Sequence, residues 1–191
     1  NQEDMLALAG VTDAGRDADV GEVVRSRIPW LVINLGTALV ASMVIGMFQA
    51  QIQQLVALAV LMPVVASIGG NAGTQALTVS VRALAMREVS AANGWRILRR
   101  EIAVGLLNGA AIAVLLSLAT WLWFREPSLS LVIGAAVVIN LVAAALAGTL
   151  APLALDRLGR DPAVASPVFV SWVTDTIGFL AFLGLAALIL L

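Results

Sequence analysis

Five long apolar stretches dominate this sequence and constrain its fold more than any other feature. They occupy approximately residues 29–48, 55–84, 102–124, 129–153 and 163–191. Each is close to the roughly 20 apolar residues that a helix needs to cross a hydrocarbon core about 30 Å thick. Hydrophobic residues make up 61% of the chain and charged residues only 12%, which is atypical of a soluble domain. The sequence therefore predicts an all-α membrane protein with five transmembrane helices in residues 29–191, preceded by a polar segment in residues 1–28.

The residue types that are missing exclude several classes of chemistry. The chain has no His and no Cys, and all eleven of its basic residues are Arg. Zinc and haem sites, thiol nucleophiles and Schiff-base lysines are therefore excluded. A net charge of −1 also argues against nucleic-acid binding. The remaining groups are carboxylates, amides, hydroxyls and carbonyls, which suit Mg²⁺, Ca²⁺ and Mn²⁺. We expect no enzymatic activity, because a single buried carboxylate has no plausible nucleophile as a partner.

The arginines predict how the chain is oriented in the membrane. Ten of the eleven lie before the first apolar stretch, at the inner end of the second stretch (Arg82), or in the connections that follow the second and fourth stretches. By the positive-inside rule this side is cytoplasmic. Arg125 alone belongs to the opposite side. The pattern predicts a multi-pass protein with its N-terminus in the cytoplasm and its C-terminus outside.

One acidic residue, Asp175, interrupts the last apolar stretch in the segment SWVTDTIGFLAF. A charged residue at the centre of a membrane helix costs about 2.5–3.5 kcal/mol on insertion scales. Three explanations remain open: protonation, a hydrogen bond to Thr174 or a facing amide, or a water-filled cavity that holds a cation. Ser171 and Gly178 would share its helix face. Pro167 predicts an irregular backbone at the inner end of this helix.

A second unusual segment, PVVASIGGNAGTQAL, occupies residues 63–77. Its proline and three glycines predict a helix that is bent or locally open. Asn71, Thr74 and Gln75 bring amide and hydroxyl groups to that place, where they can contact the water shell of a cation. Packing of small residues between helices explains the glycines equally well. Three further amides, Asn34, Asn108 and Asn140, we interpret as hydrogen-bonding groups between helices.

Three segments carry a resemblance to a known family. They read PVVASIGGNAGTQALTVSVRALAMRE, SWVTDTIGFLAF and, before the latter, LGRDPAVASP. Together they resemble the membrane domain of the MgtE family of magnesium transporters and channels, and the likeness extends over nearly the whole chain. One departure is Ser166, where the family pattern often has Asn before the proline of the fifth helix.

The resemblance implies a homodimer embedded in lipid, with a pore on the two-fold axis lined mainly by the second and fifth helices. It implies Mg²⁺ transport across the bacterial inner (plasma) membrane, with Asp175 as the pore carboxylate and a backbone oxygen contributed near Ser171. The expected metal contacts are thus Asp175 and Ser171, and the expected pore-lining residues are Gly70, Asn71, Thr74, Gln75, Thr174 and Gly178. An N-terminal domain and a CBS pair are expected to precede residues 1–10, which resemble the end of a connecting helix.

Acidic residues near the cytoplasmic end allow a second, regulatory Mg²⁺ site. The candidates are Glu3, Asp4, Asp156 and Asp161. Solvated loop charges explain these residues equally well. Mg²⁺ is therefore expected as the transported ion and as a possible regulatory ligand.

Two other functions compete with a channel-like pore. A proton-coupled secondary transporter would use Asp175 as its relay. A membrane scaffold subunit would use the polar residues only to join helices. Nothing in the sequence resembles an ATP site, so direct pumping by this chain is not expected.

Overall fold

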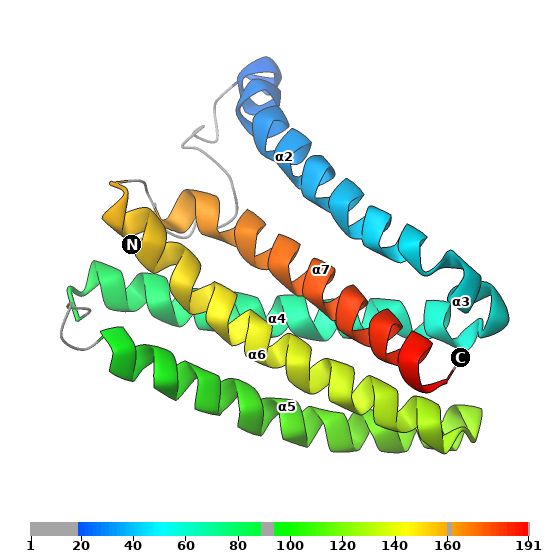
Figure 1. The fold of residues 1–191 in the computed structure, drawn as a ribbon. Coiled ribbons are helices and arrows are strands. Elements are labelled where there is room, and N and C mark those ends of the chain that lie inside the picture. The colour runs from blue at the N-terminus through cyan, green and yellow to red at the C-terminus, as the bar shows by residue number, and fades with distance from the viewer. Residues whose placement is uncertain (1–18, 89–93, 160–161, 191) are drawn as a thin grey trace.

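The structure, a computed structural model, describes residues 19–88, 94–159 and 162–190. Within them the chain forms α2 (Val20–Met47), α3 (Gln49–Gln54), α4 (Ala57–Ala85), α5 (Gly94–Phe124), α6 (Pro127–Arg157) and α7 (Pro162–Ile189). All of these except the short α3 are long and apolar enough to cross a membrane. The predicted all-α architecture with five spanning helices is confirmed (Figure 1).

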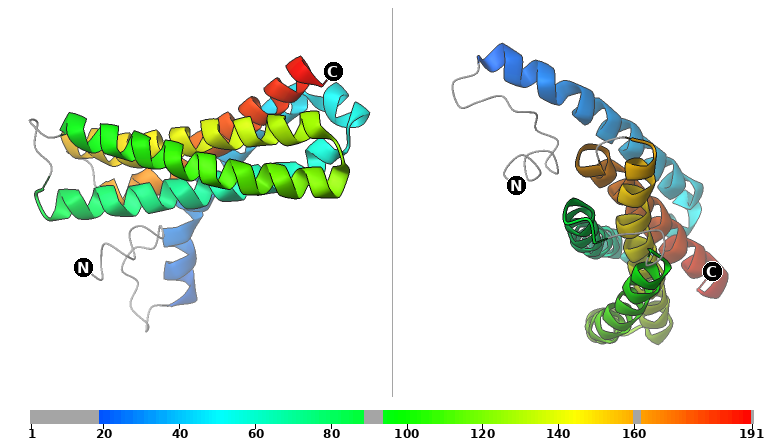
Figure 2. Two further views of the ribbon diagram at one scale, coloured as in Figure 1. Left: turned by 90° about the horizontal axis from the view of Figure 1, so that it is seen from below. Right: turned by 90° about the vertical axis from the view of Figure 1, so that its left-hand side faces the viewer.

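Helix α6 lies at the centre of the bundle. It packs against α4, α5 and α7, whereas α2 packs mainly against α7 at one end and diverges from the other helices at its N-terminal end (Figures 1 and 2). Burial follows this arrangement, since 67% of the apolar section of α6 is buried but only 6% of that of α2. In a single copy of the chain, helix α2 therefore has nearly all of its surface exposed.

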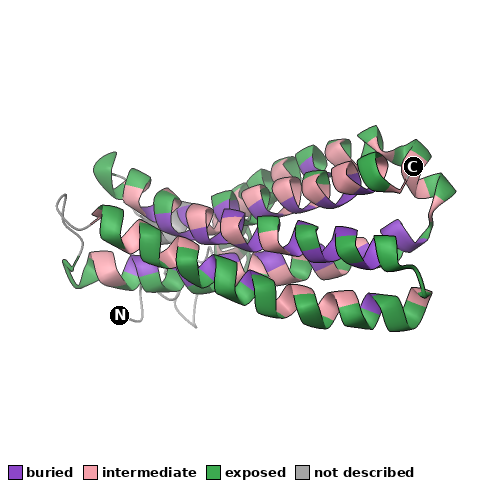
Figure 3. Ribbon diagram, turned by 60° about the horizontal axis from the view of Figure 1, so that its bottom comes forward, coloured by how far each residue is buried: buried purple, intermediate pink, exposed green. Residues whose placement is uncertain are grey.

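The main core lies between α4, α6 and α7. Large side chains that are completely buried there include Leu58, Val65, Ile133, Val137, Phe182 and Leu183. Phe48 and Ile52, from the end of α2 and from α3, pack over one end of this core. Figure 3 shows buried residues gathered where the helices face each other and exposed residues on their outer sides.

Glycines set the distance between α6 and its neighbours. A Cβ atom at Gly105 of α5 would lie 3.0 Å from the Leu141 carbonyl oxygen, and one at Gly148 of α6 would lie 2.7 Å from the Gly73 carbonyl oxygen. Lipid tails are as apolar as the side chains, so membrane helices associate through such close packing rather than through the hydrophobic effect.

The described parts of the connections after α5 and after α6 each contain a residue with a positive φ angle. Arg125 (φ 58°) and Glu126 join α5 to α6, and Pro127 takes the first helical position, where its missing N–H is not needed. Gly159 follows α6 with φ +67°, a conformation that costs glycine no strain. Asp19 caps α2 by accepting a hydrogen bond of 3.2 Å from the Gly21 amide.

The predicted opening of the glycine-rich segment and the predicted irregularity at Pro167 are wrong. Helix α4 is continuous from Ala57 to Ala85, through the glycine-rich segment, and α7 is continuous through Pro167. In a bilayer no water replaces a broken backbone hydrogen bond, so a spanning segment gains more by staying helical than glycine or proline costs it. The glycines serve the alternative role, which is close packing: Gly69 and Gly73 are buried against side chains of α6 and α7.

Candidate cation pathway

Asn140 of α6 marks the place where three helices meet. Its side chain is completely buried, and its Nδ2 atom donates a hydrogen bond of 3.0 Å to the Val65 carbonyl oxygen of α4. Gly69 of α4 and Gly178 of α7 both lie directly against this side chain. The interpretation of Asn140 as a hydrogen-bonding group between helices is confirmed.

Asp175 and Asn71 lie at the same height in the bundle. On α7, Thr174, just before Asp175, packs against Gly73 of α4, and Gly178, after Asp175, packs against Asn140. On α4, Asn71 likewise lies between Gly69, which packs against Asn140, and Gly73, which packs against Thr174. The carboxyl group and the amide are therefore carried by neighbouring helices at one level of the membrane.

The Asp175 carboxylate has no partner within the part of the chain that the structure describes. Asp175 is only partly buried, and neither an arginine nor a hydrogen-bond donor from those residues contacts it. The Thr174 hydroxyl donates to the Ser171 carbonyl oxygen at 3.1 Å instead, so a hydrogen bond from Thr174, one of the three explanations left open for Asp175, does not form in the structure. Ser171 is exposed, and its carbonyl oxygen accepts this bond in addition to the hydrogen bond of the helix itself.

A polar stripe runs along the exposed side of α4. Its members, all exposed, are Ser67, Asn71, Thr74, Gln75, Thr78 and Arg82. The Thr74 hydroxyl donates to the Gly70 carbonyl at 2.9 Å, so its own oxygen remains available as an acceptor. A Cβ atom at Gly70 would have no neighbour within 4 Å, so this position also faces open space. Contact between lipid and such a stripe is unfavourable, which implies that water or protein covers it.

The structure separates two of the predicted pore-lining residues from the others. Thr174 and Gly178 are buried, Thr174 against Gly73 and Gly178 against Asn140. Within one chain they shape the contact between helices and expose little surface. The other predicted positions, on the polar stripe of α4 and at Asp175 and Ser171, are exposed or partly exposed.

A groove between α4 and α5 reaches α6 at its floor. Two adjoining cavities of about 260 and 330 Å³ occupy it, and both are lined by Gln75, Asn108 and Leu141. Asn108 is exposed and forms no hydrogen bond to another helix within the described residues. The same holds for Asn34 on α2, so within the described part of one chain neither amide links two helices, and their interpretation as such links is not confirmed. The spacing of residues in the sequence does not predict this groove, because the groove depends on the distance between α4 and α5 in the folded bundle.

No group of three or more acidic residues that could hold a metal ion occurs among the residues that the structure describes. Asp156 is exposed near the end of α6. Glu3, Asp4 and Asp161 lie outside the described residues, so the regulatory Mg²⁺ site stays a prediction. A cation at Asp175 would need ligands from water or from a second copy of the chain.

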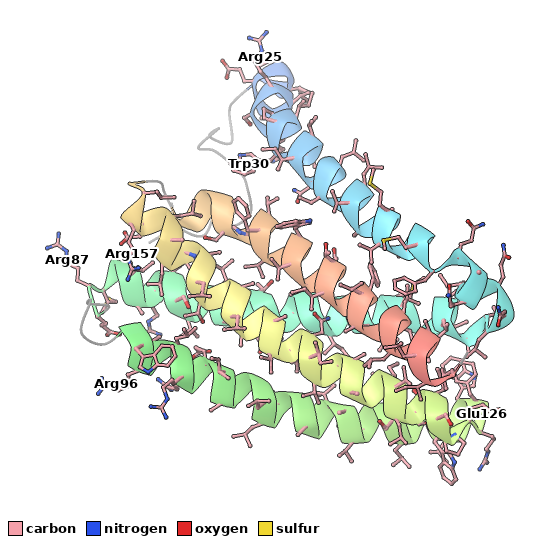
Figure 4. All side chains as sticks on the ribbon, in the orientation of Figure 1. Arg25, Trp30, Arg87, Arg96, Glu126 and Arg157 are labelled. Atoms are coloured by element: carbon pink, nitrogen blue, oxygen red, sulfur yellow. The ribbon has the colours of Figure 1, made fainter. Side chains whose placement is uncertain are left out.

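Arginines gather at one end of the bundle. Arg87, Arg96 and Arg157 lie at the same end, while Glu126 lies at the opposite end (Figure 4). At that opposite end the Arg125 guanidinium stacks over the Trp121 ring at 5.5 Å. The fold therefore brings together arginines from α5, from α6 and from the turn after α4.

Comparison with known proteins identifies the family. Residues 62–185, more than half of the chain, match the MgtE family, described as a divalent cation transporter. The chain belongs to the MgtE family. The magnesium transporter MgtE of Enterococcus faecalis is 32% identical over 185 residues, which is 97% of this chain and 41% of that protein. The magnesium transporter MgtE of Thermus thermophilus is 36% identical over 165 residues, covering 86% of this chain and 36% of that protein.

The MgtE protein of Bacillus subtilis gives a similar result, with 32% identity over 160 residues and 36% of that protein covered. The chain thus spans about two-fifths of the length of the curated relatives that it matches. These relatives are named as transporters, which agrees with the expectation that an MgtE chain of this kind is not an enzyme.

Proposed function

We propose that this chain forms the membrane pore of a Mg²⁺ transporter and that two copies assemble around an ion path on a two-fold axis. In this proposal α4 and α7 line the path, Asp175 supplies one carboxylate from each copy, and the polar stripe of α4 supplies amide and hydroxyl oxygens. The pore domain comprises residues 29–191, and the preceding residues connect it to cytosolic regulatory domains in the full-length protein.

One observation above all supports this function. Asp175 is only partly buried and has no partner within the described part of its own chain, and it lies level with Asn71 on the uncovered polar stripe of α4. A carboxylate and a row of amides at membrane depth must contact water, a cation or other protein. A second copy related by two-fold symmetry would cover both features at once.

The charges and the chemistry of the ion fit this arrangement. Two carboxylates, one from each copy, balance the charge of one Mg²⁺. Mg²⁺ prefers octahedral oxygen ligands at about 2.0–2.1 Å and gives up its water reluctantly. The ion would therefore pass with most of its water shell. Asn71, Thr74 and Gln75 offer oxygen acceptors to those water molecules.

The driving force would be the ion gradient and the membrane potential. Each elementary charge that crosses gains about 2.3 kcal/mol per 100 mV, so a divalent ion gains twice as much. The cluster of arginines at one end of the bundle supports a cytoplasmic location for that end. Entry of Mg²⁺ would then run from the end near Glu126 toward the end near Arg157.

The test is Mg²⁺ flux into liposomes that contain the full-length protein. Wild type should carry Mg²⁺, and Asp175→Asn should reduce the flux by at least about tenfold, because the fixed charge at the centre of the membrane is lost. Glu126→Gln is the matched control: it removes an exposed carboxylate at the end of the bundle and should leave the flux unchanged. Equal flux for wild type and Asp175→Asn would refute the proposal.

The same preparation separates the competing functions. A proton-coupled carrier would show flux that depends strongly on a pH gradient and would retain activity in Asp175→Glu. A scaffold would show no flux in any variant. The pore predicts Mg²⁺ currents that depend weakly on pH and that Asp175→Glu reduces, because the longer side chain narrows the path.

A further inference from the structure

The carboxamide of Asn140 fills a tight space between the two helices that we propose to line the ion path. A Cβ atom at Gly178 of α7 would lie 2.6 Å from Asn140 Nδ2 and 3.0 Å from its Cγ, and one at Gly69 of α4 would lie 2.8 Å from Cγ. Carbon atoms in van der Waals contact are about 3.5–4.0 Å apart. The side chain therefore limits how closely α4 and α7 approach α6, and both glycines are required for it to fit.

Folding alone does not explain an amide at this position. Val65 lies inside α4, where its carbonyl oxygen already accepts the hydrogen bond of the helix itself, so the bond from Asn140 is an additional one. The Oδ1 atom of Asn140 is buried and has no partner among the described residues. An unpaired buried oxygen lowers stability, and an apolar side chain of the same size would avoid that cost. This net cost indicates a purpose of the amide beyond joining α6 to α4.

The position of Asn140 points to that purpose. Gly178 is less than one helical turn from Asp175, and Gly69 is two residues from Asn71. Any change in the space that Asn140 fills would move the backbones that carry these two polar groups. Packed interiors respond to a change of even one methylene group.

We infer that Asn140 is a positioning residue that sets the separation of α4 and α7 at the level of Asp175. This inference rests on the proposed function. The separation determines the width of the ion path, and the width determines how well Mg²⁺ is preferred over the larger Ca²⁺. Asn140 contacts neither ion and acts through the helices on which Asn71 and Asp175 lie.

A double-mutant cycle in the full-length protein tests the inference. Gly178→Ala forces a methyl group against Asn140, Asn140→Ala removes all three atoms that this methyl group would meet, and the double variant combines the two changes. The readout is the ratio of Mg²⁺ to Ca²⁺ flux in liposomes. We expect each single variant to shift the ratio by about fivefold or more and the double variant to bring it back toward wild type, because residues in contact are energetically coupled.

Two matched variants separate positioning from general destabilisation. Gly105→Ala and Gly109→Ala crowd α5 against α6, where a Cβ atom would lie 3.0 Å from the Leu141 carbonyl oxygen and 3.2 Å from the Val138 Cα atom. They should lower the melting temperature of the protein but leave the flux ratio unchanged, because α5 carries neither Asp175 nor Asn71. A shift of the ratio as large as that of Gly178→Ala would overturn the inference.

The outcomes also distinguish this inference from the proposed function. If wild type carries no Mg²⁺, the proposed function fails and the inference fails with it. If wild type carries Mg²⁺ and the shifts of the two single variants simply add, only the inference fails. If Gly178→Ala does not fold, Asn140→Ala decides alone, and an unchanged flux ratio in that variant overturns the inference.

Discussion

The side-chain amide of Asn140 on α6 donates a hydrogen bond of 3.0 Å to the backbone carbonyl of Val65 on α4, at a position from which solvent is excluded. This bond ties the central helix to the helix that carries the polar stripe. It lies next to Gly178, less than one turn from Asp175 on α7. An interaction within one chain therefore fixes the helices beside the candidate ion path, although the path itself is proposed to lie between two chains.

Replacing Asn140 with Asp should destabilise the protein. The change keeps the shape of the side chain but removes the donor to Val65 and places a carboxylate in a fully buried position. We expect a loss of at least about 1–3 kcal/mol, measured as a lower melting temperature in detergent. Asn140→Leu should cost less, because it leaves no polar group without a partner. A larger loss for Leu than for Asp would show that shape, not hydrogen bonding, determines stability at this position.

Replacing Gly148 with Ala should weaken the contact between α6 and α4. The new Cβ atom would lie 2.7 Å from the Ala76 Cβ and 2.8 Å from the Leu77 backbone nitrogen, and backbone atoms cannot move aside cheaply. Overpacking of this kind typically costs about 1–3 kcal/mol. Gly36→Ala is the control, because a Cβ atom there would have no neighbour within 4 Å. Thermal unfolding of both variants checks the prediction, and equal melting temperatures would contradict it.

The polar stripe of α4 should face a second copy of the chain. These 191 residues contain no cysteine, so a single cysteine introduced among them reports on one position of this part of the protein. Thr74→Cys, in native membranes, should give a covalent dimer with a short bifunctional thiol reagent. Leu107→Cys is the control, because Leu107 of α5 is 72% exposed and lies outside the polar stripe. Dimers that form equally well from both variants, or from neither, would contradict a dimer interface at the stripe.

The two ends of the bundle should be accessible from opposite sides of the membrane. A thiol reagent that cannot cross the membrane should label Glu126→Cys in intact cells. Leu158→Cys, at a position that is 74% exposed beyond α6, should be labelled only after the membrane is opened. The reverse pattern would show that the arginine-rich end is not cytoplasmic.

Much of the fold could be predicted from the sequence, because apolar length alone determines which segments cross a bilayer. The ends of the helices were harder to place. The first spanning helix begins at Val20 rather than near residue 29, since the polar residues before Pro29 continue the same helix and Asp19 caps it. Helix α3 was missed, because QAQIQQ is too short and too polar to show a period.

The glycine-rich segment shows why the site was predicted only in part. Its composition indicates a weak helix. Gly69 and Gly73 are nevertheless required there, because Asn140, Val170 and Thr174 of other helices leave no room for a Cβ atom. The sequence of one helix does not show which residues of other helices will contact it. For the same reason the three asparagines, Asn34, Asn108 and Asn140, looked alike in sequence, and the structure shows that only Asn140, of these three, joins two helices.

The most direct test of the account is the rate at which Asp175→Cys reacts with a water-soluble thiol reagent in the membrane. Leu180→Cys, on the same helix at a position that is 47% exposed, provides the comparison. If Asp175 lines an aqueous path for Mg²⁺, Asp175→Cys should react at least about tenfold faster than Leu180→Cys, because a thiol in hydrocarbon does not ionise. Added Mg²⁺ should slow that reaction. Equal rates for the two cysteines, with no effect of Mg²⁺, would contradict the central claim.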